Sequence, residues 1–291
     1  AKSLGDNPNR EHGGRCHRQR PTMNFLRLAH TKTMDKPEDY SEETMAALAK
    51  RYKKSAKITN ESRANKLTDN TVIMILSESF SDPTRVPGIT FTEDPMPNIR
   101  ALKNTTTAGL MLSPSINGGT ANIEHQALTG LSLALFDNSM QSPYQELVPH
   151  QKSPYTFNQI WNSVYGKNGS VAFHPFYKHM YLRDSDYKKF GFSKLYTLDS
   201  KPEITHQDHL GTSPYVSDAA SYQNVLDALG NSGHAQFIQL VTMQNHTPYD
   251  DYYPDNQFRE ADVSELSDDE KWDIDSYAKG VDITDQATED F

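Results

Sequence analysis

One stretch decides the fold: Thr71-Val-Ile-Met-Ile-Leu-Ser77. It is a continuous apolar run of strand length with polar residues on either side, which is typical of a central strand buried on both faces of a parallel sheet. The run Gln236-Phe-Ile-Gln-Leu-Val-Thr-Met243 reads as a further strand and ends just before Asn245-His246. A shorter strand is predicted at Ser170–Phe173, and Ala108-Gly-Leu-Met-Leu-Ser113 is another apolar run.

Helical patterns separate these strands. They are a helix from Ala121 to Leu128 closed by Thr129-Gly130, helices at 156–165 and 177–189, one capped by Ser217, and a final helix from Ile274 to Phe291. Strands that alternate with helices predict an α/β fold, a doubly wound and mainly parallel sheet with helices on both faces. Because such a domain needs a further strand after the final helix, we expect the fold to be missing its C-terminal part.

Composition narrows the class of protein. The chain has 291 residues, 35% of them hydrophobic, with a mean hydropathy of -0.74, which suits one large globular domain or two small ones. Its apolar runs are too short to span a bilayer, and no signal peptide is expected. The single cysteine, Cys16, excludes an internal disulfide framework and a multi-cysteine zinc site.

Charge divides the chain in two. Residues 1–70 hold 15 Lys and Arg against 9 Asp and Glu; with a net charge of -9 overall, residues 71–291 carry -15. An acidic body argues against nucleic acid as a partner. The basic front is compatible with an anionic membrane surface or, the favoured interpretation, a solvated linker. We predict a basic N-terminal region over 1–70, comprising an arm at 1–20, a helix at 41–54 and a linker, and a catalytic domain over 71–291.

Polar residues at the carboxyl ends of strands are the first candidates for chemistry, because ligands bind there in open α/β sheets. Glu78 follows the first strand directly and could be a hard-metal ligand, or simply a turn or capping acid. Thr120 follows Gly118-Gly119 at the start of a helix, where a phosphate could bind. A metal touching its hydroxyl would make that oxygen a nucleophile, whereas the plainer alternative is a threonine helix cap.

Four more candidates are scattered along the chain. His174 and His246 each follow a predicted strand, and Tyr181 and Arg183 lie on the segment after His174. Arginine is suited to gripping a phosphate through paired hydrogen bonds, although each of these residues could also be a capping, surface or core side chain. Neither a P-loop nor a Gly-x-Ser-x-Gly elbow is present.

Taken in order, these segments resemble the lipoteichoic acid synthase family, phosphoglycerol transferases of the alkaline phosphatase and sulfatase superfamily. The resemblance rests on Ser77-Glu-Ser-Phe80, Pro97-Asn98, the segment from Asn117 to Gly130, His174-Pro with Tyr181-Leu-Arg-Asp184, and Met243-Gln-Asn-His246. It extends over residues 24 to 291, since Lys36-Pro-Glu-Asp-Tyr-Ser41 is similar to the linker before the catalytic domain, whereas residues 1–20 match nothing in the family.

The resemblance implies a role for each candidate. Glu78 would bind a divalent metal, Mn²⁺ or Mg²⁺, and Thr120 would be the metal-bound nucleophile. The glycerol phosphate would be surrounded by His174, Tyr181, Arg183 and His246, with His246 or His174 protonating the leaving oxygen. The reaction would move glycerol phosphate from the phosphatidylglycerol head group, through a phospho-threonine, to a glycopolymer or glycolipid acceptor.

The same resemblance implies a location and one departure. Family members face the outside of the cell membrane, held there by transmembrane helices that are absent from this chain. They complete the metal site with an Asp-His pair after a late strand, and this sequence has no such pair there. Its only Asp-His, Asp208-His209, comes too early and is interpreted as a loop feature. We therefore expect an incomplete metal site.

Other functions stay open at this point. A sulfatase would share the fold, but Cys16-His-Arg-Gln-Arg20 lacks the proline of the formylglycine signature. A phosphatase-like hydrolase of the superfamily remains an alternative, while a phosphoethanolamine transferase is disfavoured by the single cysteine. The chain could also be an inactive glycerophosphate-binding module or an interaction protein. The acceptor is open between polyglycerolphosphate, a glycolipid primer and a wall polysaccharide.

Overall fold

The computed structural model describes residues 32–114, 119–260 and 266–291. At its centre is a parallel four-stranded sheet in the order β1-β4-β2-β3. The strands are β1 (Val72–Leu76), β2 (Ser170–Phe173), β3 (Leu195–Tyr196) and β4 (Phe237–Val241). The predicted parallel sheet is confirmed, and β3 is an addition to the strands that the sequence predicted.

Helices cover both faces of this sheet. The α-helices are α2 (Glu42–Glu61), α3 (Pro97–Thr105), α4 (Thr120–Thr129), α5 (Pro143–Glu146), α6 (Gln159–Tyr165), α7 (Arg183–Lys189), α8 (Asp218–Gly230) and α9 (Asp268–Asp290). Short 3₁₀ turns join them at Leu67–Asp69, Pro83–Arg85, Leu133–Leu135, Val148–His150, Gly166–Gly169, Met180–Leu182 and Gln257–Glu260. The long α9 begins at a capping box in which the Ser267 and Glu270 side chains each bind the other's backbone amide.

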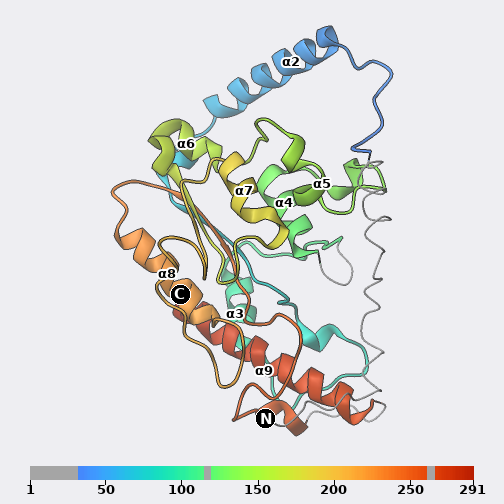
Figure 1. Ribbon diagram of the computed structural model, residues 1–291, viewed down its shortest axis with the longest axis vertical. Helices are drawn as coiled ribbons and strands as arrows, with labels where there is room; N and C mark the ends of the chain where they lie inside the picture. Colours follow the sequence, from blue (N-terminus) through green and yellow to red (C-terminus); the bar gives the residue numbers. More distant parts are fainter. Residues whose placement is uncertain (1–31, 115–118, 261–265) are drawn as a thin grey trace.

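The two faces follow from the alternation of side chains along the strands. On one face, Val72 and Met74 of β1 pack into a cluster with residues of α4, α6 and α7. On the other face, Ile73 and Ile75 pack with residues of α8 and α9. In Figure 1 the two sets of helices lie on opposite sides of the sheet, as the doubly wound prediction requires.

The structure differs from the sequence-based expectations at four helices and one apolar run. The final helix, α9, begins at Asp268 rather than at Ile274. The helix predicted at 41–54 continues to Glu61, and the helices predicted at 156–165 and 177–189 begin only at Gln159 and Arg183. The late start of α7 has a backbone reason, because Tyr181 has a φ of 55° and Leu182 one of 61°. The run at 108–113 forms no strand, and its side chains are exposed.

The helix α2 stands apart from the body of the molecule (Figure 1). None of its residues is buried. Among the described residues, no helix has both the length and the apolar character needed to cross a bilayer. The predicted arm at 1–20 lies outside the described residues.

Candidate active site

The two residues expected to share a metal lie in direct contact. The Thr120 hydroxyl donates a hydrogen bond of 2.5 Å to Oε1 of Glu78. The Glu78 side chain is only 7% exposed, and burial raises its pKa against the opposing effects of the Thr120 hydrogen bond and the charges of His246 and Arg183. A buried carboxylate with so little solvation is well placed to bind a cation.

Local backbone geometry explains why these two residues meet. Glu78 follows β1 and donates its backbone amide to Oγ1 of Thr242, at the end of the neighbouring β4. Gly119 precedes α4 with a φ of 86°, a left-handed conformation that suits glycine. The chain thus turns sharply and starts α4 at Thr120, at the edge where β1 and β4 end. The adjoining Asn117-Gly118 lies outside the described residues.

The loop after Glu78 is anchored from the far end of the chain. The Tyr277 hydroxyl, on α9, donates to the carbonyl of Ser79 at 2.7 Å and accepts from the amide of Ser81 at 2.8 Å. Ser79 has a φ of 53°, so this loop needs such support. The Tyr277 contacts therefore fix the backbone on which Glu78 is carried.

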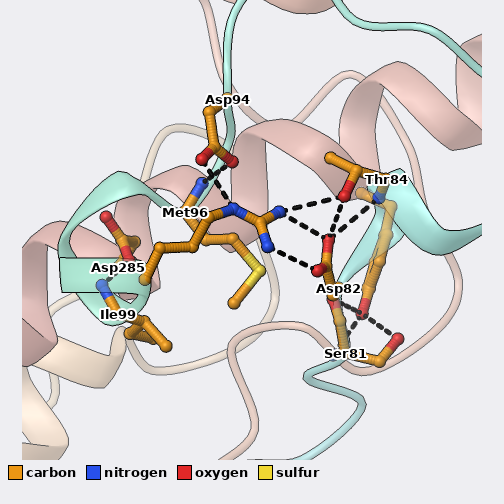
Figure 2. A network of polar contacts seen from close by, with 9 residues as sticks. Ser81, Asp82, Thr84, Asp94, Met96, Ile99 and Asp285 are labelled. Atoms are coloured by element: carbon orange, nitrogen blue, oxygen red, sulfur yellow. Dashed lines mark hydrogen bonds and ion pairs between the residues drawn. The ribbon is translucent and has the colours of Figure 1, made fainter. Parts of the chain in front are cut away.

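A second network holds the continuation of this loop (Figure 2). Arg100 on α3 binds both carboxylate oxygens of Asp82, at 2.7 and 2.8 Å, and Oδ2 of Asp94 at 2.6 Å. These bonds, with that from Thr84, lower the pKa of Asp82 to about 2. The carboxylate of Asp285, on α9, accepts two backbone amides at the start of α3, at 2.9 and 2.8 Å. These contacts tie α3 and α9 to the site loop.

His246 completes the group around Glu78. Its Nε2 lies 4.0 Å from Oε1 of Glu78, and its Nδ1 lies 2.6 Å from the carbonyl oxygen of Thr247. Because a carbonyl only accepts hydrogen bonds, Nδ1 carries a proton and Nε2 faces Glu78. The Tyr215 hydroxyl donates to the same carbonyl at 2.6 Å. The imidazole is thereby oriented with its reactive nitrogen toward the Glu78 carboxylate.

His174 and Arg183 lie beside this group but are buried, at 2% and 3% exposure. The Nδ1 of His174 donates to the carbonyl of Val241 at 3.1 Å, so its Nε2 accepts from Nη1 of Arg183 at 3.2 Å. Burial, together with the charge of Arg183, lowers the pKa of His174 well below its ordinary value. His174 is therefore neutral and positions Arg183.

Arg183 is held on its other side by Glu124, a residue that the sequence reasoning did not single out. Glu124 accepts from Nε and Nη2 of Arg183 at 3.1 and 2.8 Å and is fully buried. It also accepts from the hydroxyls of Tyr144, at 3.0 Å, and Tyr187. A signal was available, since Glu124 follows Thr120 by four residues and so lies on the same face of α4.

The structure brings the six predicted site residues together in two adjoining groups. Glu78, Thr120 and His246 form one, and His174 and Arg183 form the other; the half-buried Tyr181 places its ring 5.4 Å from the Arg183 guanidinium carbon. The two groups adjoin at the end of β4, because Nδ1 of His174 donates to the carbonyl of Val241 and the next residue, Thr242, accepts from the amide of Glu78. The expected loop character of Asp208-His209 is also found, since His209 is bonded to the carbonyl of Ser213.

A pocket of about 800 Å³ opens beside the Glu78–Thr120 contact, and both residues line it. Much of the remaining wall is apolar, including Phe80, Met111 and Ile274. A molecule bound there would place a polar part at Thr120 and an apolar part against this wall.

Glu78 and Thr120 are the candidate ligands for a divalent cation. They offer a buried carboxylate and a hydroxyl, which are oxygen donors of the type that hard cations prefer. Across residues 32–114, 119–260 and 266–291, no three His, Cys, Asp or Glu side chains are grouped so as to hold a metal ion. Glu78 and Thr120 thus fit part of a metal site.

This fold and site define a class of protein. Residues 70–291 match the sulfatase family, and the chain belongs to that family. Members of the alkaline phosphatase and sulfatase superfamily generally use divalent metals.

Two solved structures are similar to this chain. The chain is 38% identical to the Streptococcus pyogenes phosphoglycerol transferase GacH, solved in complex with sn-glycerol-1-phosphate, with a TM-score of 0.81 over 89% of this chain and 65% of that one. The lipoteichoic acid synthase LtaP of Listeria monocytogenes shares the fold at 20% identity, with a TM-score of 0.58 over 77% of this chain and 51% of that one.

A third relative is much longer than this chain. The putative cyclic beta-1,2-glucan modification protein of Rhizobium meliloti (strain 1021) is 33% identical over 213 residues, which is 72% of this chain but 30% of the relative. The chain therefore spans less than a third of that protein and about two thirds of GacH.

Proposed function

We propose that the chain carries the nucleophilic half of a phosphoglycerol transferase, which moves glycerol phosphate from phosphatidylglycerol to a carbohydrate acceptor. The observation that carries the proposal is the 2.5 Å contact between the Thr120 hydroxyl and the buried Glu78 carboxylate. It is supported by the 38% identity to GacH, a phosphoglycerol transferase solved with sn-glycerol-1-phosphate.

In the first step, the Thr120 oxygen attacks the phosphorus of the lipid head group. A bond forms between that oxygen and phosphorus, and the bond from phosphorus to the diacylglycerol oxygen breaks. The hydroxyl proton of Thr120 passes to the Glu78 carboxylate, its hydrogen-bond acceptor. The pocket beside Thr120 has an apolar wall suited to the lipid part of such a donor. The Thr120 oxygen stands at the start of α4, where the helix dipole favours a phosphate.

His246 is the better proton donor to the leaving oxygen. The alternative, His174, is neutral, and its Nε2 already accepts a hydrogen bond from Arg183. The Nε2 of His246 instead faces the Glu78 side of the site, and when protonated it has a hydrogen to give. In the second step the same nitrogen takes the proton of the acceptor hydroxyl as that oxygen attacks phosphorus. The Thr120 oxygen leaves and recovers its proton from Glu78.

Arg183 acts as a fixed positive charge near the phosphoryl group. Its guanidinium is gripped by Glu124 and His174, so it is preorganised and does not reorganise during the reaction. A divalent cation held by Glu78 and Thr120, Mn²⁺ or Mg²⁺, would act as a Lewis acid and neutralise phosphoryl charge.

A carbohydrate acceptor is supported by the relative whose name concerns the modification of a cyclic glucan. If the acceptor is a glycopolymer of the cell envelope, the protein would act at the extracellular face of the membrane. A sulfatase is the second candidate, on the family match alone. It is disfavoured because the residue beside Glu78 is Thr120, and formylglycine requires a cysteine or serine there.

The test follows the lipid product in the full-length protein. Purified protein is incubated with Mn²⁺ and a fluorescent phosphatidylglycerol, and released diacylglycerol is measured alongside mass spectrometry of the peptide that contains Thr120. We expect release by the parent protein, a glycerophosphoryl adduct on Thr120, and neither with Thr120→Ala. The matched control is Thr129→Ala, at the other end of α4, which should retain activity.

Three outcomes would count against the proposal. Release of diacylglycerol by Thr120→Ala would refute the role of Thr120. Cleavage of an aryl sulfate without turnover of phosphatidylglycerol would favour the sulfatase. Binding of glycerol phosphate independently of Mn²⁺ and without turnover would identify an inactive binding module.

A further inference from the structure

The helix α2 has a surface that the proposed reaction does not use. It runs for 20 residues, and none of them is buried. Met45, Leu48 and Tyr52 are 45%, 37% and 64% exposed, although such side chains are usually covered. In Figure 1 the helix projects from the rest of the molecule.

Three of its four large apolar side chains lie on one side, whereas Ile58, which is 59% exposed, lies among the cations on the other. At about 100° per residue, Met45, Leu48, Ala49, Tyr52 and Ala56 fall within an arc of about 100°, which is an amphipathic stripe. In proteins, most of the stability of an α-helix comes from the packing of its amphipathic face rather than from helix propensity. A stripe of this kind therefore indicates a partner that covers it.

The opposite side is cationic. Lys50, Arg51, Lys53, Lys54 and Lys57 occupy an arc of about 160° centred opposite the apolar stripe. No acidic residue lies between positions 44 and 60, whereas residues 71–291 carry a net charge of -15. The helix thus concentrates positive charge in a chain that is otherwise acidic.

The apolar stripe and the cationic side of α2 together indicate which kind of partner covers this helix. A second copy of α2 would need apolar positions repeated over at least three or four heptads, and the stripe from Met45 to Ala56 spans fewer than two. An acidic protein surface would bind the cations but leave the apolar stripe in water. An anionic lipid surface satisfies both, because the stripe enters the boundary while lysine and arginine side chains reach the head groups.

We propose that α2 is an interfacial anchor, which lies in the plane of an anionic lipid surface with Met45, Leu48 and Tyr52 inserted. Arg51 and Lys53 lie next to the stripe on either side, so their long side chains can reach the head groups from the edges of the buried face. This anchor is separate from the Thr120 chemistry and does not depend on it.

Vesicle partitioning tests the proposal. The chain is centrifuged with vesicles of phosphatidylcholine alone or mixed with phosphatidylserine, an anionic lipid that is not the proposed donor. We expect binding only to the mixed vesicles, weakening as salt rises. At about fivefold per cation, the variant Lys53→Gln/Lys54→Gln/Lys57→Gln should lower partitioning on the order of 100-fold. The variant Leu48→Gln/Tyr52→Gln should also lose binding, because the stripe no longer inserts.

Matched controls separate the helix from the rest of the chain. Lys103, Lys152 and Lys167 are exposed on the body, and changing all three to glutamine should leave partitioning unchanged. The same is expected when the arginines of residues 15–20 are changed to glutamine. None of the α2 substitutions touches a buried residue, so each variant should keep the circular dichroism of the parent.

Insertion has its own readout in Tyr52→Trp. Its emission should shift to the blue on mixed vesicles and be quenched by brominated acyl chains. The proposal is overturned if the chain fails to bind mixed vesicles at low salt, if the Leu48 and Tyr52 variant binds normally, or if the arm arginines alone carry binding. It is also overturned if light scattering shows a dimer that these α2 substitutions dissociate.

Discussion

Replacing Glu124 with glutamine should strongly destabilise the protein. Glu124 is fully buried and Arg183 is 3% exposed, so the guanidinium depends on this one carboxylate for its counter-charge. Burial alone would lower the pKa of Arg183, but the charge and hydrogen bonds of Glu124 raise it overall. Breaking a buried ion pair of this kind costs about 3–5 kcal/mol of unfolding free energy.

The geometry explains why glutamine is a poor substitute. Glu124 accepts hydrogen bonds from Nε and Nη2 of Arg183 and from the hydroxyls of Tyr144 and Tyr187. Glutamine keeps one accepting oxygen and turns an NH₂ group toward these donors. At least one buried donor then has no acceptor, which adds to the loss of charge.

The measurement is a double-mutant cycle in urea. Arg183→Met should also destabilise the chain, since it leaves the Glu124 carboxylate buried without a cation. In Glu124→Gln/Arg183→Met no charge remains buried, so the double variant should be more stable than the sum of the single losses predicts, by about 2 kcal/mol or more. The control Glu203→Gln changes an exposed glutamate and should stay within about 0.5 kcal/mol of the parent. Single losses below about 1 kcal/mol, or strict additivity, would refute the reasoning.

Three further predictions concern stability. Burial lowers the pKa of His125 to about 4; since the unfolded chain then binds the proton first, His125 should remove about 2 kcal/mol of unfolding free energy between about pH 7.5 and pH 5. His125→Phe should therefore lose about 2 kcal/mol less than the parent over this range, with the buried His174 still contributing to the fall, which urea titrations at both pH values would check. A Cβ at Gly280 would collide with the side-chain oxygen of Asn245, so Gly280→Ala should lower the melting temperature by an amount equivalent to about 1–3 kcal/mol, and an unchanged value would contradict the packing of α9. Asp285→Ala removes the acceptor of two amides at the start of α3 and should cost about 1 kcal/mol in a urea titration, whereas no loss would show that this cap is idle.

The parts of the fold that could be predicted from sequence are those with strong local signals. The strands β1, β2 and β4 are short apolar runs. Glycines flank α4 and Ser217 caps α8, as their sequences predict. The apolar run at 108–113 forms no strand. An apolar segment becomes a strand only when it has a pairing partner, and none of the described residues pairs with this one.

The candidate site also has features that could be predicted from the sequence and features that could not. Glu78 and Thr120 could be predicted because each stands at a strand end or a helix start, and the structure places them 2.5 Å apart. The burial of Arg183 could not, because it depends on Glu124, 59 residues away in sequence. No local pattern reveals which carboxylate will meet which cation across such a separation.

The tyrosine on α9 has a consequence for how the chain matures. The turn that carries Glu78 is made early in translation, yet the hydroxyl that clamps Ser79 and Ser81 belongs to Tyr277, nearly two hundred positions later. Because a nascent polypeptide emerges from its amino end, that turn stays without its clamp until α9 has left the ribosome. The turn after Glu78 is therefore ordered late, and a nascent intermediate lacking α9 should leave the contact between Glu78 and Thr120 without this support.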